Sequence, residues 1–139
     1  MSDLERFSIT IPKELATAFD RRSRRKGYEN RSEAIRNLIR DALVQEEWQN
    51  PKARVAATVT LVYDHHTRTL TDRVTEVQHD HGELIVSSMH VHLDHHNCLE
   101  VIVLRGAAKD VQALANKLQA IKGLKHAQVT LATEGTAIV

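Results

Sequence analysis

A short alternating segment near the start of the chain limits how its N-terminal part can fold. Residues 6–11 read Arg-Phe-Ser-Ile-Thr-Ile, so apolar and polar side chains would occupy opposite faces of an extended chain. This alternation predicts one half-buried strand. No second strand pattern follows within the next 40 residues, and a single strand cannot form a sheet by itself. The segment is therefore expected to pair with the same segment of a second copy.

Two helices are predicted to follow this strand. Pro12 suits the first turn of a helix, and Gly27 is expected to end that helix. Asn30 and Glu33 have the spacing of a capping box, which opens a second helix with an apolar stripe. A strand and two helices in residues 1–47 are close to the lower size limit for an independent core. This again favours a dimer of the N-terminal domain.

Charge is distributed unevenly along the chain, although its formal net charge is only +1. Residues 1–40 hold ten Lys or Arg side chains against six Asp or Glu, which indicates a polyanionic partner. Five aromatic residues are too few for the stacking platforms that bind RNA or single strands, so duplex DNA is the expected partner. Arg6, Ser8 and Thr10 would form a polar strand face that fits a major groove. The alternative is that this face is only solvated.

The pattern changes after a polar stretch that contains Asn50 and Pro51, a pair typical of a boundary. Residues 48–53 are interpreted as a linker and residues 54–139 as a second domain. Strands are expected at 55–63, 84–93, 98–104 and 126–133, and helices at 68–78 and 107–121. This βαββαβ order predicts a ferredoxin-like α+β fold, in which both helices cover one face of a four-stranded antiparallel sheet. The uncovered face is expected to contact another subunit.

Three features of the sequence predict the cellular location of the protein. No uncharged stretch is longer than ten residues, and the first residues lack the pattern of a secretion signal. The single cysteine, Cys98, cannot form an internal disulfide. The sequence therefore predicts a cytoplasmic protein with no membrane partner.

Histidine and cysteine residues of the second domain indicate a metal site. His90 and His92 are two residues apart on a predicted strand, so both imidazoles share a face, and Cys98 follows after a short polar loop. Imidazole and thiolate donors suit Ni, Cu, Zn or Co better than Mg or Ca. A four-coordinate ion needs one more ligand, for which His79 and His81 are the candidates. The alternative is an ordinary strand pair with Cys98 as a small core residue.

Polar residues around these donors are expected to orient them, as residues near metal ligands usually do. The candidates are Tyr63, Gln78 and Glu100. The remaining histidines are expected to be solvated, or to bind metal only when it is in excess: His65, His66, His81, His95, His96 and His126.

The N-terminal motifs resemble the ribbon-helix-helix family of prokaryotic repressors. The resemblance rests on the strand RFSITI, the Gly27-Tyr28 turn and the stretch NRSEAIR that begins at Asn30. It implies two sets of DNA contacts. The strand residues that read bases are Arg6, Ser8 and Thr10. The residues that hold a phosphate at the start of the second helix, where anions bind readily, are Arg31 and Ser32.

The C-terminal motif resembles the nickel-responsive regulators of the same superfamily. It consists of Gln78-His79, then His90-Val-His92, five residues, and Cys98-Leu-Glu. By this resemblance, His90, His92 and Cys98 of one subunit and His79 of a neighbour form a square-planar site, with one Ni²⁺ per subunit. The resemblance also implies an ACT-like C-terminal domain, a homotetramer built as a dimer of dimers, and a repressor of nickel-uptake genes whose operator binding nickel favours.

Two other functions are left open by the residues themselves. A thiolate metalloenzyme could use Cys98, although no oxyanion-hole loop or Gly-rich cradle accompanies it, so the chain is not expected to be an enzyme. The second alternative is a regulator that has the same DNA-binding segment but senses copper, cobalt, zinc or a small molecule.

Overall fold

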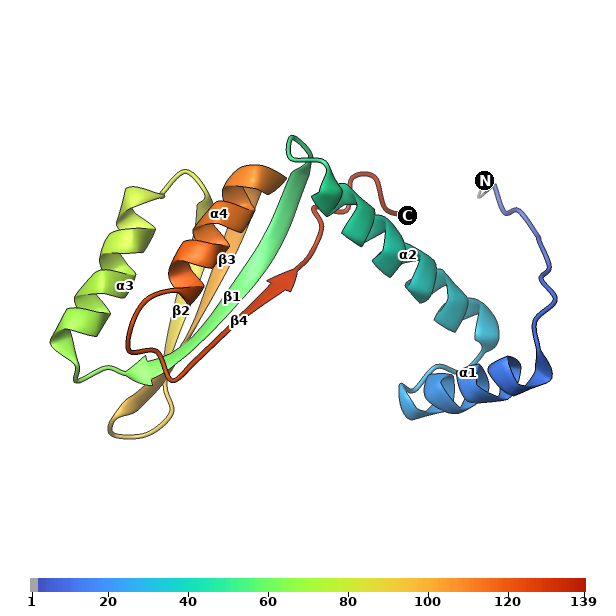
Figure 1. Cartoon of the computed structure of the whole chain (residues 1–139), viewed down its shortest axis with the longest axis horizontal. Helices are drawn as coiled ribbons and strands as arrows, with labels where there is room; N and C mark the ends of the chain where they lie inside the picture. Colours follow the sequence, from blue (N-terminus) through green and yellow to red (C-terminus); the bar gives the residue numbers. More distant parts are fainter. Residues whose placement is uncertain (1–2) are drawn as a thin grey trace. The chain divides into compact units, whose positions relative to one another are not determined.

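The computed structural model describes residues 3–139, and the chain divides into two compact units, Met1–Ile39 and Arg40–Val139. The elements in chain order are α1 (Lys13–Arg25), α2 (Arg31–Gln49), β1 (Arg54–Asp64), α3 (Arg68–Asp80), β2 (Ile85–His92), β3 (Asn97–Ala107), α4 (Ala108–Gln119) and β4 (His126–Leu131) (Figure 1). The division falls within α2. Across the described residues, no helix is long and apolar enough to cross a membrane.

The N-terminal segment before α1 does not form part of a sheet. Residues 3–12 contain no strand, so the strand predicted at 6–11 is wrong for the single chain. The physical reason is that the backbone groups of one such segment have no neighbouring strand to bond. Phe7 and Ile9 are consequently 68% and 65% exposed, which leaves the predicted apolar face uncovered.

Helix α1 begins and ends as the sequence predicts. Pro12 directly precedes its first residue. At the other end, Gly27 adopts a φ of +85°, a left-handed conformation that favours glycine. The N–H of Tyr28 donates to the carbonyl of Ser23 at 3.0 Å, as in a Schellman motif. The chain therefore leaves α1 in a defined turn.

Helix α2 begins at the predicted cap but ends later than predicted. The side-chain oxygen of Asn30 accepts a hydrogen bond from the N–H of Glu33 at 2.9 Å, which caps the helix. The helix continues to Gln49. Residues 48 and 49, which the sequence placed in a linker, are therefore helical.

The C-terminal unit contains a four-stranded antiparallel sheet in the order β2-β3-β1-β4. The element order confirms the predicted βαββαβ arrangement. Residues of β1 alternate between buried and partly buried, since α3 and α4 cover one face of the sheet (Figure 1). The core between this face and the helices includes Val55, Val59, Leu61, Val74, Leu104, Val111, Leu114 and Leu118.

The edge strand β2 carries exposed apolar side chains on the face away from the helices. Met89 and Val91 of β2, and Leu93 directly after it, alternate with His90 and His92, and all three apolar side chains are exposed. Successive side chains of a strand point to opposite faces, so the histidines share the helix-covered face. The apolar face lacks a covering layer in the single chain.

The residues after β4 bond to the last turns of α2. The indole Nε1 of Trp48 donates to the carbonyl of Ala132 at 2.9 Å, and Trp48 also packs against the core of the sheet unit. The hydroxyl of Thr133 donates to Glu47 Oε1 at 2.7 Å. These contacts attach the C-terminal end of α2 to the sheet unit.

Replacing Trp48 by Phe keeps an aromatic ring but removes the N–H donor to Ala132. We expect the free energy of unfolding to fall by about 1 kcal/mol, the usual net value of one hydrogen bond. Urea denaturation followed by circular dichroism measures the change. Trp48→Ala also removes the ring packing and should cost more. Wild-type stability in Trp48→Phe would show that the bond contributes nothing.

Candidate metal centre and nucleic-acid interface

The hairpin of β2 and β3 places three of the predicted metal donors on one face of the sheet. The antiparallel register pairs His92 with Cys98 and His90 with Glu100. The ring centroids of His90 and His92 are 5.3 Å apart. Directly opposed residues of an antiparallel pair point to the same face, so two imidazoles and one thiol are neighbours there.

Cys98 is a fully buried free thiol. Its Sγ lies 3.5 Å from the carbonyl oxygen of Tyr63, to which it donates a weak hydrogen bond. Burial raises the pKa of the Cys98 thiol above its ordinary value, because desolvation disfavours the thiolate. A soft thiol beside two imidazoles is a donor set that fits nickel, copper, cobalt or zinc.

The single chain does not gather the four predicted ligands into one group. Among residues 3–139, no three His, Cys, Asp or Glu side chains are close enough together to hold one metal ion. His79 lies near the end of α3, where its side chain is exposed. The hairpin therefore brings potential donors near one another, without a complete group of donors among the described residues.

The three residues predicted to orient the ligands form one hydrogen-bonded group. Glu100, 6% exposed, accepts a hydrogen bond from the hydroxyl of Tyr63 at 2.6 Å and from Nε2 of Gln78 at 2.5 Å. The same carboxylate lies 3.7 Å from Nδ1 of His90. Burial, followed by the bond to the Glu100 carboxylate, raises the pKa of Tyr63 well above its ordinary value, so the hydroxyl keeps its proton. Glu100 is thus fixed as an acceptor beside a predicted ligand.

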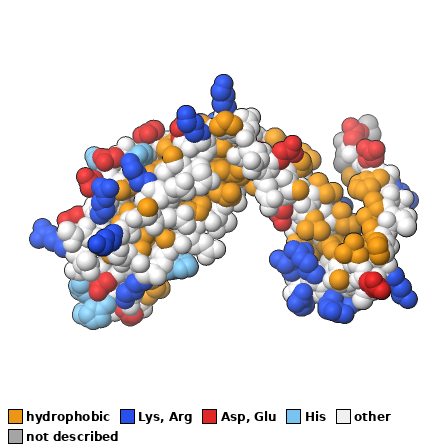
Figure 2. Space-filling view, viewed as in Figure 1, with side chains coloured by type: hydrophobic (Ala, Val, Ile, Leu, Met, Phe, Trp, Pro, Cys, Tyr) orange, Lys and Arg blue, Asp and Glu red, His pale blue; other side chains and the backbone are white. Residues whose placement is uncertain are grey.

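Histidines that the sequence analysis set aside lie next to the predicted ligands. The ring of His65 is 4.5 Å from that of His92 and 4.5 Å from that of His66. The ring of His66 is in turn 5.2 Å from that of His95 and 5.3 Å from that of His96. Figure 2 shows histidine side chains gathered at the end of the sheet where β2 and β3 connect. The signal for this neighbourhood was the His65-His66 pair at the end of a predicted strand.

The predicted DNA-contacting residues lie in the N-terminal unit. Arg6, Ser8 and Thr10 are exposed along the segment before α1. A groove of about 570 Å³ lies between this segment and α2; its apolar lining residues are Leu4, Phe7, Ile9, Ile35 and Ile39. Figure 2 shows Lys and Arg side chains gathered at one end of this unit. The unit therefore combines an uncovered apolar groove with a positive surface.

The start of α2 carries the two residues predicted to hold a phosphate. Ser32 is exposed, whereas the guanidinium of Arg31 donates two hydrogen bonds to Asp20, at 2.8 and 2.7 Å. This pairing lowers the pKa of Asp20 below its ordinary value. This ion pair joins residues eleven positions apart on two helices and has no signal in the sequence.

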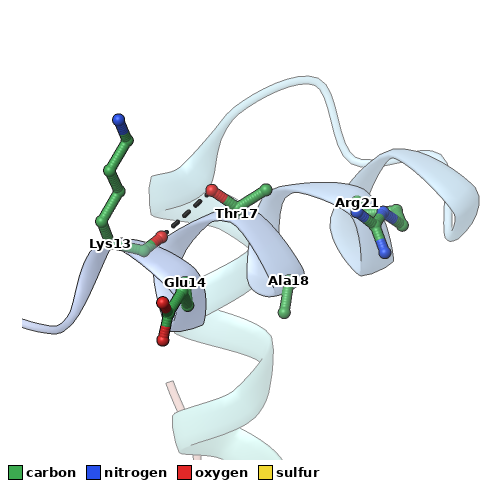
Figure 3. A pocket seen from close by; sticks show the side chains of 5 residues that line it. All are labelled: Lys13, Glu14, Thr17, Ala18 and Arg21. Carbon is green, nitrogen blue, oxygen red and sulfur yellow. Dashed lines mark hydrogen bonds between the residues drawn. The ribbon is translucent and has the colours of Figure 1, made fainter.

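A shallow hollow on α1 lies apart from all predicted site residues. It measures about 340 Å³ and is lined by five residues of α1 (Figure 3): Lys13, Glu14, Thr17, Ala18 and Arg21. The hydroxyl of Thr17 donates to the carbonyl of Lys13 at 3.0 Å, an ordinary bond within one helix turn. The side chains of the hollow suggest no metal or catalytic chemistry.

Two family models match the chain. The model of the NikR C terminal nickel binding domain matches residues 56–132, which is more than half of the chain. The model of the ribbon-helix-helix protein, copG family, matches residues 5–46. The two matches lie one after the other and cover the segments for which the sequence predicted these two domains.

Proteins of three organisms align over nearly the whole chain. A protein of Desulfovibrio desulfuricans is 53% identical over 135 residues, 97% of each chain. A protein of Solidesulfovibrio magneticus is 50% identical over 139 residues, 100% of each chain. A protein of Geobacter metallireducens is 50% identical over 135 residues, 97% of each chain. All three carry the name nickel-responsive regulator.

Among solved structures, an uncharacterized protein of Thermotoga maritima has a similar fold. Its TM-score is 0.50 at 19% identity, and the match covers 56% of this chain and 96% of that chain. At this identity the likeness concerns the fold alone. The family models and the sheet topology together confirm the predicted α+β fold class. With a ribbon-helix-helix domain followed by a NikR C-terminal domain, and with full-length relatives at about half identity, the chain belongs to the family of nickel-responsive transcription regulators.

Proposed function

We propose that this regulator is a nickel-dependent repressor of nickel-uptake genes, which binds operator DNA more tightly when its C-terminal unit holds nickel. One observation carries the proposal. The buried free thiol of Cys98 lies in register with His92, on the face that also carries His90. Both imidazoles are exposed beside this buried thiol, so they are accessible to a metal ion, and imidazole with thiolate is a donor set that nickel binds.

The proposed ligands are His90, His92 and Cys98 of one chain and His79 of a neighbouring copy, with one Ni²⁺ per subunit. Two features support a fourth ligand from outside the chain. His79 is exposed near the end of α3, and the described residues contain no complete group of donors. Bound nickel would supply a cationic centre that joins donors of two chains. The thiol of Cys98 would give up its proton, and Glu100 would hold the His90 ring from its second nitrogen.

The N-terminal unit is proposed to act as a dimer. Phe7 and Ile9 are largely exposed beside the groove, and a second copy of the segment could pair with the first and cover them. Arg6, Ser8 and Thr10 of both copies would then form a two-stranded ribbon of the size that enters a major groove. At the start of α2, Ser32 and the backbone N–H groups would hold a phosphate, while Arg31 stays paired with Asp20.

The C-terminal units are proposed to assemble a homotetramer, a dimer of two such dimers. The support is the exposed apolar face of β2, with Met89, Val91 and Leu93, which another subunit could cover. Nickel can favour repression only if it binds more tightly to the DNA-competent arrangement of the tetramer than to the others. The cytoplasmic location expected from the sequence fits a protein that binds the genome and stays a prediction.

One alternative is favoured by the same donor set. Imidazole and thiolate bind Cu²⁺ more tightly than Ni²⁺ in the usual order of divalent affinities. Affinity alone therefore does not identify the metal that controls DNA binding. Repeating the DNA titration described below with Cu²⁺, Co²⁺ or Zn²⁺ in place of nickel would identify which metal changes DNA affinity.

The central prediction concerns the effect of nickel on DNA affinity. Fluorescence anisotropy of labelled uptake-promoter DNA, titrated with protein, should show at least about tenfold tighter binding with nickel than with a chelator, a typical allosteric coupling. Cys98→Ala should lose this effect together with the sulfur-to-nickel charge-transfer absorbance. His126→Ala removes a histidine of β4 outside the proposed ligand set and should behave as wild type. Equal DNA affinity with nickel and with chelator would refute the proposal.

The ribbon assignment predicts a specific loss of DNA affinity. Arg6→Ala should weaken operator binding by roughly tenfold or more, since one good contact from Arg to guanine discriminates by about 1–3 kcal/mol. Arg73→Ala removes an arginine of α3, from the C-terminal unit, and should leave operator affinity unchanged. Anisotropy at fixed salt measures both variants. An equal loss in the two would point to general charge and against base contact by Arg6.

The group around Glu100 predicts a loss of stability. Tyr63→Phe removes one of the donors to a buried carboxylate, so the free energy of unfolding should fall by about 2 kcal/mol. Tyr28→Phe removes the same hydroxyl from a bond with the neutral side chain of Asn37 and should cost less. Urea denaturation compares the two variants. A smaller loss for Tyr63→Phe than for Tyr28→Phe would contradict the role given to the carboxylate.

A further inference from the structure

The five residues between His92 and Cys98, of which the last is the first residue of β3, form an ordered turn. They separate two proposed ligands, His92 and Cys98. The N–H of Leu93 donates to the carbonyl of Asn97 at 2.9 Å, which closes the turn at its base. Exposed connections of this length are mobile unless their backbone groups find partners. The backbone groups of this turn have partners within the turn and on neighbouring residues.

Asp94 binds two of the backbone N–H groups of this turn. Its Oδ1 accepts hydrogen bonds from the N–H groups of His96 and Asn97, at 2.8 and 2.7 Å. Its Oδ2 accepts a hydrogen bond from the side-chain amide of Asn97 at 2.9 Å. Both carboxylate oxygens are thus used within the turn. Asp94 is therefore placed to shape the turn, and its oxygens do not face the imidazoles as additional ligands.

Further contacts attach the turn to the rest of the sheet unit, and among them the ring Nε2 atoms of His65 and His66 lie 2.9 and 2.7 Å from the carbonyl oxygen of His95. Nζ of Lys125 donates to Oδ1 of Asn97 at 2.5 Å, and the backbone N–H of Lys125 donates to the carbonyl of Val62 on β1 at 2.8 Å. The N–H of His65 donates to the carbonyl of His96 at 2.9 Å. The turn is consequently held by β1 and by the residues that lead into β4.

This arrangement fixes the side-chain amide of Asn97. Its nitrogen donates to the carboxylate of Asp94, and its oxygen accepts from the ammonium group of Lys125. A flipped amide would place its N–H groups against the ammonium group and its oxygen against the carboxylate, so both hydrogen bonds would be lost. Asn97 is also the residue directly before Cys98. A fixed Asn97 therefore limits the backbone freedom of the cysteine, although none of the three side chains reaches the sulfur.

We propose that Asp94, acting through Asn97 and assisted by Lys125, is a positioning residue for the metal site, which holds Cys98 against His92 before metal arrives. The inference rests on the proposed ligand assignment. Its physical basis is that ordering of donors costs free energy whenever it occurs. If folding already orders the turn, metal binding does not have to supply the free energy of ordering the donors. The donors also keep a single geometry.

The experiment uses full-length protein and nickel. Equilibrium dialysis gives nickel affinity, and absorbance gives the sulfur-to-nickel charge-transfer band. Asp94→Ala should weaken nickel binding by about tenfold or more, the usual effect of losing a residue that orients a ligand. Its charge-transfer band should shift or weaken at saturating nickel. Asp94→Asn keeps the acceptor for the two backbone N–H groups and should recover part of both losses.

Asp72→Ala is the control. Asp72 is an exposed residue of α3, outside the hairpin turn and outside the proposed ligand set. The two variants change net charge equally. Asp72→Ala should keep wild-type nickel affinity and spectrum. An equal effect of both variants would assign the loss to charge and overturn the inference.

A further variant guards against failure of Asp94→Ala to fold. Lys125→Ala removes only the outer contact and leaves the backbone bonds of the turn in place, so it should weaken nickel binding in the same direction but less. Wild-type affinity and spectrum in Lys125→Ala and in any folded Asp94→Ala would refute the positioning role. Absence of nickel binding or of the sulfur band in the wild type would instead refute the proposed function.

Discussion

The antiparallel pairing of β1 with β3 is the constraint on which the candidate metal centre depends. It extends over the full length of both strands and places Tyr63 opposite Cys98 and Leu61 opposite Glu100. A shift of one residue would turn every side chain of β3 to the other face. The thiol and the carboxylate would then leave the helix-covered face, and the donors of β2 would lose their neighbours. The buried chemistry of the site is therefore a consequence of strand register, which the apolar residues of the core enforce.

The elements of the C-terminal unit could be predicted from the sequence because their signals are local. Alternating β-branched residues in β1 and helically spaced apolar residues in α3 and α4 predict each element within a few residues. The sequence indicated Tyr63, Gln78 and Glu100 as residues of the site, but it did not predict that they contact one another. Tyr63 is 37 residues from Glu100 in the chain, and only the register of β1 with β3 brings the two together.

Two features of the N-terminal unit could not be predicted from local sequence patterns. The alternation in residues 6–11 states which side chains share a face, but a strand exists only where a second strand bonds to it. Phe7 and Ile9 remain exposed because one chain holds no such neighbour for them. The pairing of Arg31 with Asp20 also escaped the sequence, since it depends on how α1 and α2 approach each other. The histidines around His92 were expected to be solvated or weak metal binders, and their closeness to His92 was not predicted, because they follow strand ends and carry no periodic signal.

The burial of Cys98 has a consequence for the chemical lifetime of the protein. Oxidants attack cysteines that are exposed and ionised, whereas this thiol is fully buried and its pKa is raised. The core of the sheet unit provides this protection, because the residues that exclude water from Cys98 also exclude peroxide.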